Sequence, residues 1–236
     1  MIDPHSYDSC RLFFASYQIP LSPEQYEKLR TYADLLVDES KRQNVTAVRG
    51  LSEIWIRHFL DAAFLLRHLP ETAKILDMGT GGGIPAIPLA IMQTGLHVTM
   101  LDSELRKIDF CRSVADQLSL DADCLCGRAE ELAHDPAYRA QFDIVVSRAM
   151  AGGSMLTELS VPFLKTGGFL YAMKGKQYDP ETERFESAAD ALGASVISAT
   201  PYTLCEEQKY LICIQKTADT PDKYPRRFAK IKRSPL

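Results

Sequence analysis

The sequence lacks any run of about 18 apolar residues, which is the length that a membrane-spanning helix requires. Its first residues, 1–7, are polar and contain neither the basic start nor the apolar stretch of a secretory signal peptide. Internal repeats and low-complexity linkers are also missing. We therefore expect a cytoplasmic protein with no membrane partner. Its 236 residues are enough for one large α/β domain, or for a domain with a cap.

Cysteine is present, but without the spacing of a metal site or a disulfide framework. The six cysteines are scattered, and none belongs to a C-x-x-C pair. Cys124 and Cys126 lie two apart in a strand-like stretch, with no histidine pair beside them. We therefore expect reduced, buried thiols and no bound metal.

Positive charge is scarce for a protein that binds nucleic acid, because 27 basic against 31 acidic side chains give a net charge of −4. The distribution is uneven, however. Residues 216–236 contain seven basic and two acidic side chains, a local charge of +5 that leaves −9 on the rest. A basic tail on an acidic body favours a directed contact with a polyanion. A solvated, partly disordered terminus would have the same composition, so charge alone leaves both interpretations open.

The pattern of predicted secondary structure changes near residue 71. Residues 1–70 have helical periodicity, with a helix start at Ser22-Pro23-Glu24-Gln25 and another at Ser52. Beyond them, strand-like and helical stretches alternate. The predicted strands are 73–78, 97–102, 122–126, 143–147, 167–174, 194–200 and 209–216, and the predicted helices are 86–93, 104–118, 153–161 and 179–191.

The most informative stretch is the glycine turn at 77–83, between the first predicted strand and the helix after it. Glycines take positive φ and let a ligand approach the backbone, and a helix start directs amide donors toward such a turn. Residues 81–86 match the G-x-G-x-x-A dinucleotide fingerprint. The D-x-G-x-G-x-G turn of S-adenosylmethionine (SAM) methyltransferases is matched by Asp77, Gly79, Gly81 and Gly83. Asp77 favours SAM, because a carboxylate suits the amino end of a methionine moiety and repels a pyrophosphate.

The alternation predicts an α/β fold with a doubly wound, mostly parallel sheet. The connection at 201–207 is too short for a helical crossover, so the last two strands are predicted to be antiparallel. Five βα units with a terminal antiparallel strand are the layout of the Rossmann-like class I SAM methyltransferase sheet. We expect three segments, namely an N-terminal helical region at 1–70, a SAM-binding core at 71–217 and a basic C-terminal tail at 218–236.

Further candidate site residues follow the second and third strands. Asp102 lies about 20 residues past the glycines, where doubly wound folds place an acid on the ribose hydroxyls. It also suits the N-cap of the helix that begins at Glu104, a role that Ser103 could share. Ala129 and Glu130 come just after the third strand, where such folds contact the adenine ring. Standing alone, Glu130 would be an acid at a helix start.

Arg148 and Lys174 end the fourth and fifth strands, at the crevice where substrate meets cofactor. The chain has no Asn- or Asp-Pro-Pro-aromatic tetrad there, which excludes adenine-N6 chemistry, and no cysteine follows a proline, as pyrimidine-C5 chemistry requires. What remains is an arginine with five fixed donors, and pairing with a nearby carboxylate is its structural alternative. His58 and Asp61, three apart on a helical face, either reach the same pocket or form a hydrogen-bonded pair.

Together these pieces resemble the bacterial 16S rRNA guanine-N7 methyltransferase G family, also called glucose-inhibited division protein B. The resemblance extends from about residue 44 to residue 236. Its stretches are Asn44–Ala47, Arg57–Asp61, Asp77–Pro88, Leu101–Ser103, Arg128–Glu130, Ser147–Ala149, Lys174-Gly175, Tyr224–Arg227 and Pro235-Leu236. The chain departs from the family pattern at Ile84, where Phe or Leu is usual, and at Ala86, where Gly is usual.

The resemblance implies a SAM-dependent enzyme that methylates N7 of a guanine in the 16S rRNA of the small ribosomal subunit. It implies SAM contacts at Gly79, Ile84, Asp102, Ala129, Glu130 and Arg148. Guanine N7 has an available lone pair and no proton to lose, so alignment and electrostatics suffice and no general base is expected. Because an Arg or Lys fork reads the N7 and O6 acceptors, Arg148 and Lys174 are the candidate catalytic, guanine-side residues.

In the tail, the predicted RNA contacts are Arg226, Arg227, Lys230, Lys232 and Arg233. We expect a monomer. Two other function classes remain open, an NAD(P)-dependent oxidoreductase and a non-catalytic SAM- or RNA-binding module.

Overall fold

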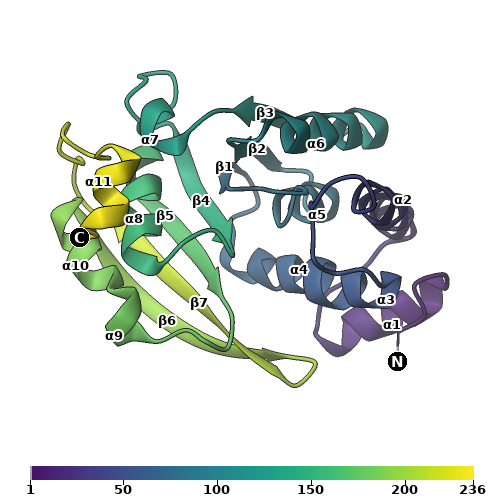
Figure 1. Cartoon of the computed structure of the whole chain (residues 1–236). Coiled ribbons are helices and arrows are strands. Elements are labelled where there is room, and N and C mark those ends of the chain that lie inside the picture. Colours follow the sequence, from purple (N-terminus) through teal and green to yellow (C-terminus); the bar gives the residue numbers. More distant parts are fainter. Residues whose placement is uncertain (1) are drawn as a thin grey trace.

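One seven-stranded sheet, covered by helices on both faces, forms the centre of the computed structural model, which describes residues 2–236 (Figure 1). Its strands are β1 Ala73–Met78, β2 Leu96–Asp102, β3 Ala122–Cys126, β4 Phe142–Arg148, β5 Leu164–Lys174, β6 Ala194–Leu204 and β7 Glu207–Lys216. Their spatial order is β3-β2-β1-β4-β5-β7-β6. Neighbours are parallel except for the β5–β7 and β6–β7 pairs, which are antiparallel. The predicted class I methyltransferase sheet is therefore confirmed.

The terminal hairpin is longer than predicted. Cys205 and Glu206 both have positive φ and close a two-residue turn, so β6 and β7 stay paired from Ala194↔Lys216 to Leu204↔Glu207. The predicted antiparallel pairing is confirmed, but the connection is shorter than the predicted 201–207, because only residues 205 and 206 lie outside the two strands. Pro201 lies within β6, which is an edge strand of the sheet, where proline's missing N–H need not remove a ladder bond.

Fourteen helical segments surround the sheet in the part of the chain that the structure describes. They are α1 Tyr7–Ser16, α2 Pro23–Glu39, α3 Leu51–Ile54, the π-helix Trp55–Leu60, α4 Asp61–Leu65, the 3₁₀-helix Leu66–His68, α5 Ala86–Met92, α6 Leu105–Leu118, α7 Ala129–Leu132, α8 Gly153–Ser160, the 3₁₀-helix Val161–Phe163, α9 Pro180–Glu183, α10 Phe185–Ala191 and α11 Phe228–Arg233.

The predicted helix boundaries agree with the structure to different degrees. The predicted start of α2 is a complete capping box, in which Gln25 N donates to Ser22 Oγ and Ser22 N donates to Gln25 Oε1. Helix α3 begins at Leu51, one residue before the predicted Ser52. The predicted helix 179–191 is two helices, because Arg184 takes φ +52° between α9 and α10.

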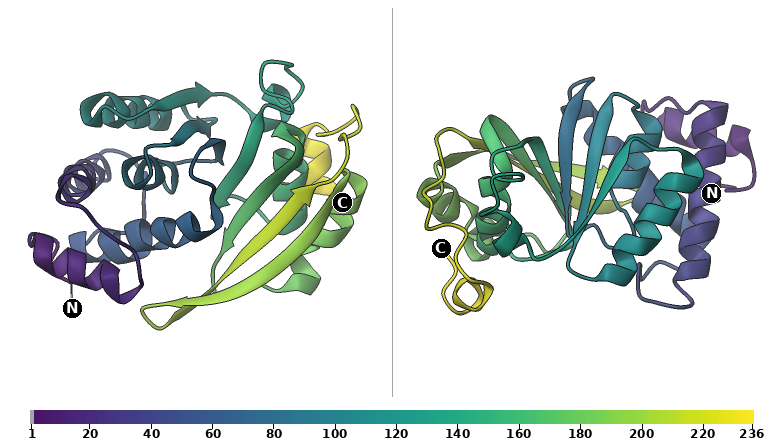
Figure 2. Two further views of the ribbon diagram at one scale, coloured as in Figure 1. Left: turned by 180° about the vertical axis from the view of Figure 1, so that it is seen from behind. Right: turned by 90° about the horizontal axis from the view of Figure 1, so that it is seen from above.

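Helices form a layer on each face of the sheet (Figure 2). Alternating strand residues divide the interior between these two layers. Ile75 packs in a cluster with α1, α2, α5 and α6, whereas its neighbour Leu76 packs on the opposite face with α8 and α10. The N-terminal helices therefore belong to one layer. On the other face α11 packs against α8, with Ile231 fully buried. Both terminal segments pack on the sheet; their division from the core at residues 70 and 217 stays a prediction.

All six cysteines are free thiols, as predicted, but the expectation that they are buried holds only in part. Cys10 and Cys111 are fully buried, whereas Cys126 and Cys205 are exposed because β3 and the hairpin turn lie at the periphery of the sheet. Across residues 2–236 no group of three or more His, Cys, Asp or Glu side chains is placed to hold a metal. None of the described helices is long and apolar enough to cross a membrane.

Candidate functional site

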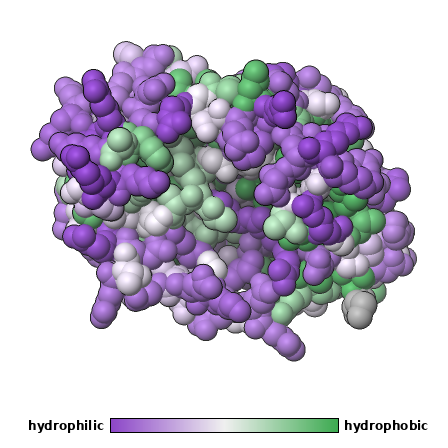
Figure 3. Space-filling view, in the orientation of Figure 1, coloured by the Kyte–Doolittle hydropathy of each residue, from purple (hydrophilic) through white to green (hydrophobic). Residues whose placement is uncertain are grey.

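The carboxyl ends of β1 to β4 border a cavity of about 380 Å³. Strands β1 and β4 are neighbours in the sheet although two other βα units separate them in sequence, so the strand order reverses there. Ligands of open α/β sheets bind at such a switch point. The residues lining the cavity include Gly79, Asp102, Ser103, Arg128, Ala129, Glu130, Met150 and Phe228. Most of the face drawn in Figure 3 is hydrophilic, and it is hollowed near its centre.

The glycine turn owes its shape to backbone that other residues rarely adopt. Gly79, Gly81 and Gly83 have φ of +71°, +59° and +91°. A Cβ atom on Gly83 would lie 2.3 Å from Ile87 Cδ1, so this glycine allows the turn to close on α5. A Cβ on Gly79 would lie 2.9 Å from Met150 Cγ, at the cavity wall. Gly79 thus borders the cavity, whereas Gly81, Gly83 and Ile84 support the turn behind it.

Asp102 ties the second strand to the glycine turn. Its Oδ2 accepts from Gly81 N at 3.1 Å, and its Oδ1 accepts from Glu104 N at 3.0 Å. The carboxylate therefore fixes the turn and the start of α6 together, while still lining the cavity beside Ser103. A carboxylate has about four acceptor positions, so two remain for a ligand.

Asp77 is completely buried beneath the turn. Its Oδ2 accepts from Thr80 Oγ1 at 2.6 Å and from Ala86 N at 3.3 Å, which joins both sides of the turn. Its Oδ1 has no hydrogen-bond partner among the described residues. Burial raises the pKa of this carboxyl to about 6, against the opposing effect of the two hydrogen bonds.

The segment after β3 forms the far end of the cavity. Ala129 and Glu130 begin the short helix α7, and Arg128 Nε pairs with Glu130 Oε1 at 2.7 Å. The ring of Phe228, from the C-terminal tail, has its centroid 5.1 Å from Arg128 Cζ. Sequence reasoning missed both Phe228 and Met150 as cavity residues. Phe228 stands in the recognisable Tyr-Pro-Arg-Arg-Phe stretch, but nothing local indicated that this stretch reaches the cavity.

A second cavity, of about 240 Å³, adjoins the first at Ala149, which lines both. Its other lining residues are Asp61, Arg148, Met173, Lys174, Gly175, Tyr202 and Lys209. These residues come from the N-terminal helices, from the ends of β4 and β5, and from the terminal hairpin. Arg148 borders only this second cavity, so the structure separates it from the other predicted cofactor residues.

Arg148 is held by the N-terminal helices. Its NH1 donates to Arg57 O at 2.7 Å and pairs with Asp61 Oδ2 at 3.3 Å, and its NH2 donates to His58 Nδ1 at 2.8 Å. Because arginine only donates, His58 Nδ1 is the acceptor and its Nε2 carries the proton, directed at Thr46 Oγ1 2.7 Å away. Burial, followed by Arg148, lowers the pKa of His58 to about 3, so the imidazole is neutral.

Asp61 is the shared acceptor of this cluster. Besides Arg148, it accepts from Tyr202 OH at 3.0 Å and pairs with Lys209 Nζ at 2.9 Å. Arg148 therefore pairs with a carboxylate and lines the second cavity at the same time, so its two predicted alternatives coincide. Asp61 also lines this cavity, whereas His58 is buried behind it, and the two are joined through Arg148 rather than to each other. Three donors of Arg148 are used, which leaves two for a ligand.

Lys174 is engaged within the protein. Its Nζ donates to Ala151 O at 2.8 Å and pairs with Glu183 Oε2 at 2.9 Å. The ammonium also lies 5.4 Å from the centroid of the Phe185 ring. Only 12% of its side chain is exposed, so little of Lys174 faces the second cavity.

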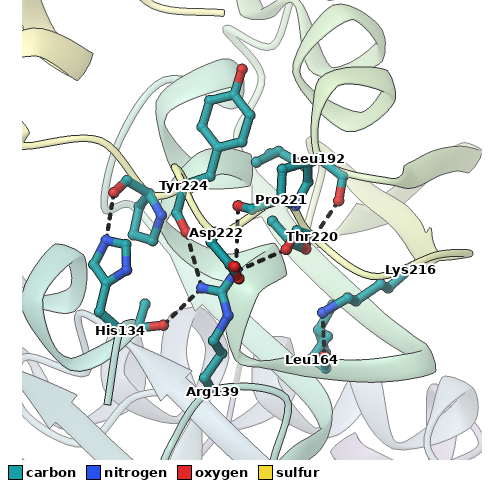
Figure 4. Close-up of polar contacts among 11 residues, drawn as sticks. His134, Arg139, Leu164, Leu192, Lys216, Thr220, Pro221, Asp222 and Tyr224 are labelled. Carbon is teal, nitrogen blue, oxygen red and sulfur yellow. Dashed lines mark hydrogen bonds and ion pairs between the residues drawn. The ribbon is translucent and has the colours of Figure 1, made fainter. Parts of the chain in front are cut away.

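Two of the seven cations counted in the basic tail are bound to other parts of the protein. Lys216 is buried and donates to Leu164 O at 2.8 Å (Figure 4), and burial lowers its pKa. Arg226 forms two hydrogen bonds through its side chain to the fully buried Glu158, with NH2 and Oε2 2.6 Å apart. Arg226 is therefore committed to Glu158, whereas the other predicted RNA-contact residues are exposed, namely Arg227, Lys230, Lys232 and Arg233.

The burial of Asp77 predicts that the stability difference between the parent and an Asp77→Asn variant depends on pH. A carboxyl whose pKa rises on folding stabilises the protein below its unfolded pKa of 3.8, and this contribution is lost as pH rises through about 6. The Asp77→Asn variant has no titrating carboxyl here, so it does not lose this stability as pH rises. We expect the unfolding free energy of the variant, relative to the parent, to increase by roughly 2–3 kcal/mol between pH 4 and pH 7. Urea unfolding at both pH values measures it, and Asp116→Asn on exposed α6 is the control. A difference that does not change with pH would contradict the argument.

The family model and the sequence relatives identify the same family. Residues 25–209 match the family described as rRNA small subunit methyltransferase G. The ribosomal RNA small subunit methyltransferase G of Moorella thermoacetica is 38% identical over 223 residues, covering 92% of this chain and 93% of that protein. Its counterpart in Streptococcus pneumoniae (strain G54) is 36% identical over 227 residues, covering 94% and 96%.

Solved structures support the fold. The O-methyltransferase from Bacillus cereus in complex with SAH has a TM-score of 0.57 at 15% identity, covering 88% of this chain and 96% of that one. TrmN from Thermus thermophilus has a TM-score of 0.51 at 19% identity, covering 69% and 53%. These structures show the class I methyltransferase fold, and the sequence matches show that this chain belongs to the rRNA small subunit methyltransferase G family.

Proposed function

We propose that the protein transfers a methyl group from SAM to N7 of a guanine in the 16S rRNA of the small ribosomal subunit, in the cytoplasm. The observation that carries the proposal is a pair of cavities that meet at Ala149. The glycine turn and Asp102 border one cavity, and Arg148 borders the other. A cofactor in the first cavity and a base in the second would place the two reacting atoms near their junction.

The residues around the first cavity suit SAM. Asp77 lies beneath the turn and not in the cavity wall, and we assign its free Oδ1 to the amino group of the methionine moiety. Asp102 retains acceptor positions for the ribose hydroxyls, and Ala129 and Glu130 border the end assigned to adenine. Bound SAM supplies a methyl group on a sulfonium, and the chain's own residues hold the two reactants in line.

The same geometry argues against the NAD(P) alternative. A dinucleotide pyrophosphate binds the free amides at a helix start. Here the first amide of α5, Ala86 N, donates to Asp77, and Ile87 N donates to Gly83 O. The pyrophosphate would also lie next to the charge of Asp77, which repels it.

On the substrate side, the chemistry of N7 refines the role of Arg148. The N7 lone pair must face the methyl group during transfer, so it cannot also accept from arginine. The two free donors of Arg148 therefore suit the adjacent O6 atom. The contacts with Asp61 and His58 fix the guanidinium in one orientation, which lowers the entropic cost of aligning the base. No group is needed to remove a proton from N7.

Exposed cations in the tail supply a surface for rRNA phosphates. Arg227, Lys230, Lys232 and Arg233 lie on or beside α11, which begins at the cavity residue Phe228. Phosphate contacts of this kind position a nucleic acid without reading its sequence. The tail is thus suited to hold the RNA backbone while the guanine enters the second cavity.

A direct test is methyl transfer to isolated small ribosomal subunits with methyl-labelled SAM. We expect label at a single guanine of 16S rRNA, at a site that borohydride and aniline cleave because N7 is methylated. Calorimetry should show binding of SAM and none of NADH. Binding of NADH without SAM would indicate an oxidoreductase, and binding of SAM without transfer to any subunit form would indicate a non-catalytic module.

The two-cavity arrangement predicts that Arg148→Gln impairs methyl transfer to the substrate without weakening SAM binding. Asp61 keeps Tyr202 and Lys209 as partners in the variant, so the fold should persist. We expect the dissociation constant for SAM to change less than threefold and single-turnover methyl transfer to fall at least a hundredfold, roughly 3 kcal/mol in the barrier. A parallel loss of SAM affinity would place Arg148 in the cofactor site instead.

The tail proposal predicts a specific salt dependence. Replacing Arg227, Lys230, Lys232 and Arg233 by Gln should weaken binding to the small subunit at least tenfold and lower the log–log salt slope by about 3, because four phosphate contacts are lost. A matched variant neutralises four exposed cations of the N-terminal region, namely Arg11, Arg30, Lys41 and Arg42. That control should bind like the parent. Equal effects in both variants would mean that only net charge matters.

A further inference from the structure

The C-terminal tail is fastened to the body rather than left as a free arm. Arg139 NH1 donates to Tyr224 O at 2.9 Å, and its NH2 donates to Thr220 O at 2.9 Å (Figure 4). His134 Nε2 lies 2.8 Å from Pro225 O. These contacts fix the carbonyls of an otherwise irregular segment to the loop before β4, so the path of residues 220–225 is set by side chains.

A second fastening follows immediately. Arg226 donates to the carboxylate of Glu158 on α8 three times, from its backbone N at 2.8 Å, Nε at 2.8 Å and NH2 at 2.6 Å. Glu158 is completely buried, so its charge requires these partners. The next turn of the tail buries Ile231 completely.

Between the Arg226 contact and Ile231 lies Phe228. Its side chain lines the 380 Å³ cavity and faces Arg128, whose Cζ is 5.1 Å from the ring centroid. Arg128 is in turn paired with Glu130, at the end of the cavity where β3 terminates. The tail therefore contributes an aromatic wall beside the residues assigned to the base of the cofactor.

We propose that Phe228 is a cofactor-binding residue, whose ring packs against the adenine of SAM and is held in place by the Arg226–Glu158 pair. The proposal rests on the proposed function, since it takes SAM as the ligand of this cavity. A planar aromatic ring beside a base gains stacking that a methyl or aliphatic group does not provide. The tail thus has two surfaces with different tasks, the inner one for SAM and the outer, cationic one for RNA.

The test is calorimetric titration of SAM into the full-length protein and its variants. Phe228→Ala should raise the dissociation constant about tenfold, whereas Phe228→Tyr, which keeps the ring, should stay within threefold of the parent. The Gln replacement of Arg227, Lys230, Lys232 and Arg233 should leave SAM affinity unchanged. SAM binding by the parent together with unaltered binding by Phe228→Ala would overturn this inference alone. Absence of SAM binding by the parent would overturn the proposed function as well.

A second pair of variants tests the fastening. Arg226→Gln alone leaves a buried, unpaired Glu158 and should destabilise the fold, so Glu158→Gln is combined with it to remove both charges. We expect this double variant to fold, as its circular dichroism would show, and to bind SAM as weakly as Phe228→Ala. SAM should also slow tryptic cleavage within residues 226–233 of the parent, because ligand and docked tail stabilise each other. Parent-like affinity in the double variant, or cleavage at an unchanged rate, would contradict the proposal.

Discussion

A buried carboxylate with one free oxygen is the constraint on which the site depends. Asp77 is the second-last residue of β1, and its Oδ2 connects Thr80 in the turn to Ala86 at the helix start. The neighbouring strand contributes a second carboxylate, since Asp102 accepts from Gly81 N. The glycine turn is thus held from two strands, and the fold accepts the cost of a partly satisfied buried charge. Such a cost is typical of positions kept for a ligand rather than for stability.

The sheet and the first cavity could be predicted from local sequence. Strand periodicity and glycine spacing are short-range signals, and the predicted residues that line this cavity lie at the end of a strand or within four residues after it. Gly79, Asp102 and Glu130 accordingly border one cavity. Where prediction failed, tertiary context decided the outcome. Pro201 is compatible with a strand because β6 is at the sheet edge, and Arg184 interrupts a helix that periodicity alone would continue.

The remaining site features depend on partners far apart in sequence. Arg148 contacts His58, 90 residues earlier, and Asp61 contacts Tyr202, 141 residues later. Arg226 finds its acceptor on Glu158, 68 residues away. Charge and composition identified the tail as basic, but they do not encode which of its cations are buried. The pairing with Glu158 on α8 is what distinguishes Arg226 from its exposed neighbours.

The position of β7 has a consequence for how the protein is made. This strand, residues 207–216, is inserted between β5 and β6, so the sheet cannot be completed until residue 216 has left the ribosome. Until then Asp61 lacks Tyr202 and Lys209, and the cavity lacks Phe228. Domains form during synthesis from the N-terminus onward, at about 5–20 residues per second. A nascent chain therefore carries the glycine turn for several seconds before residues 209 and 228 are made, and both cavities are complete only after residue 228 has emerged.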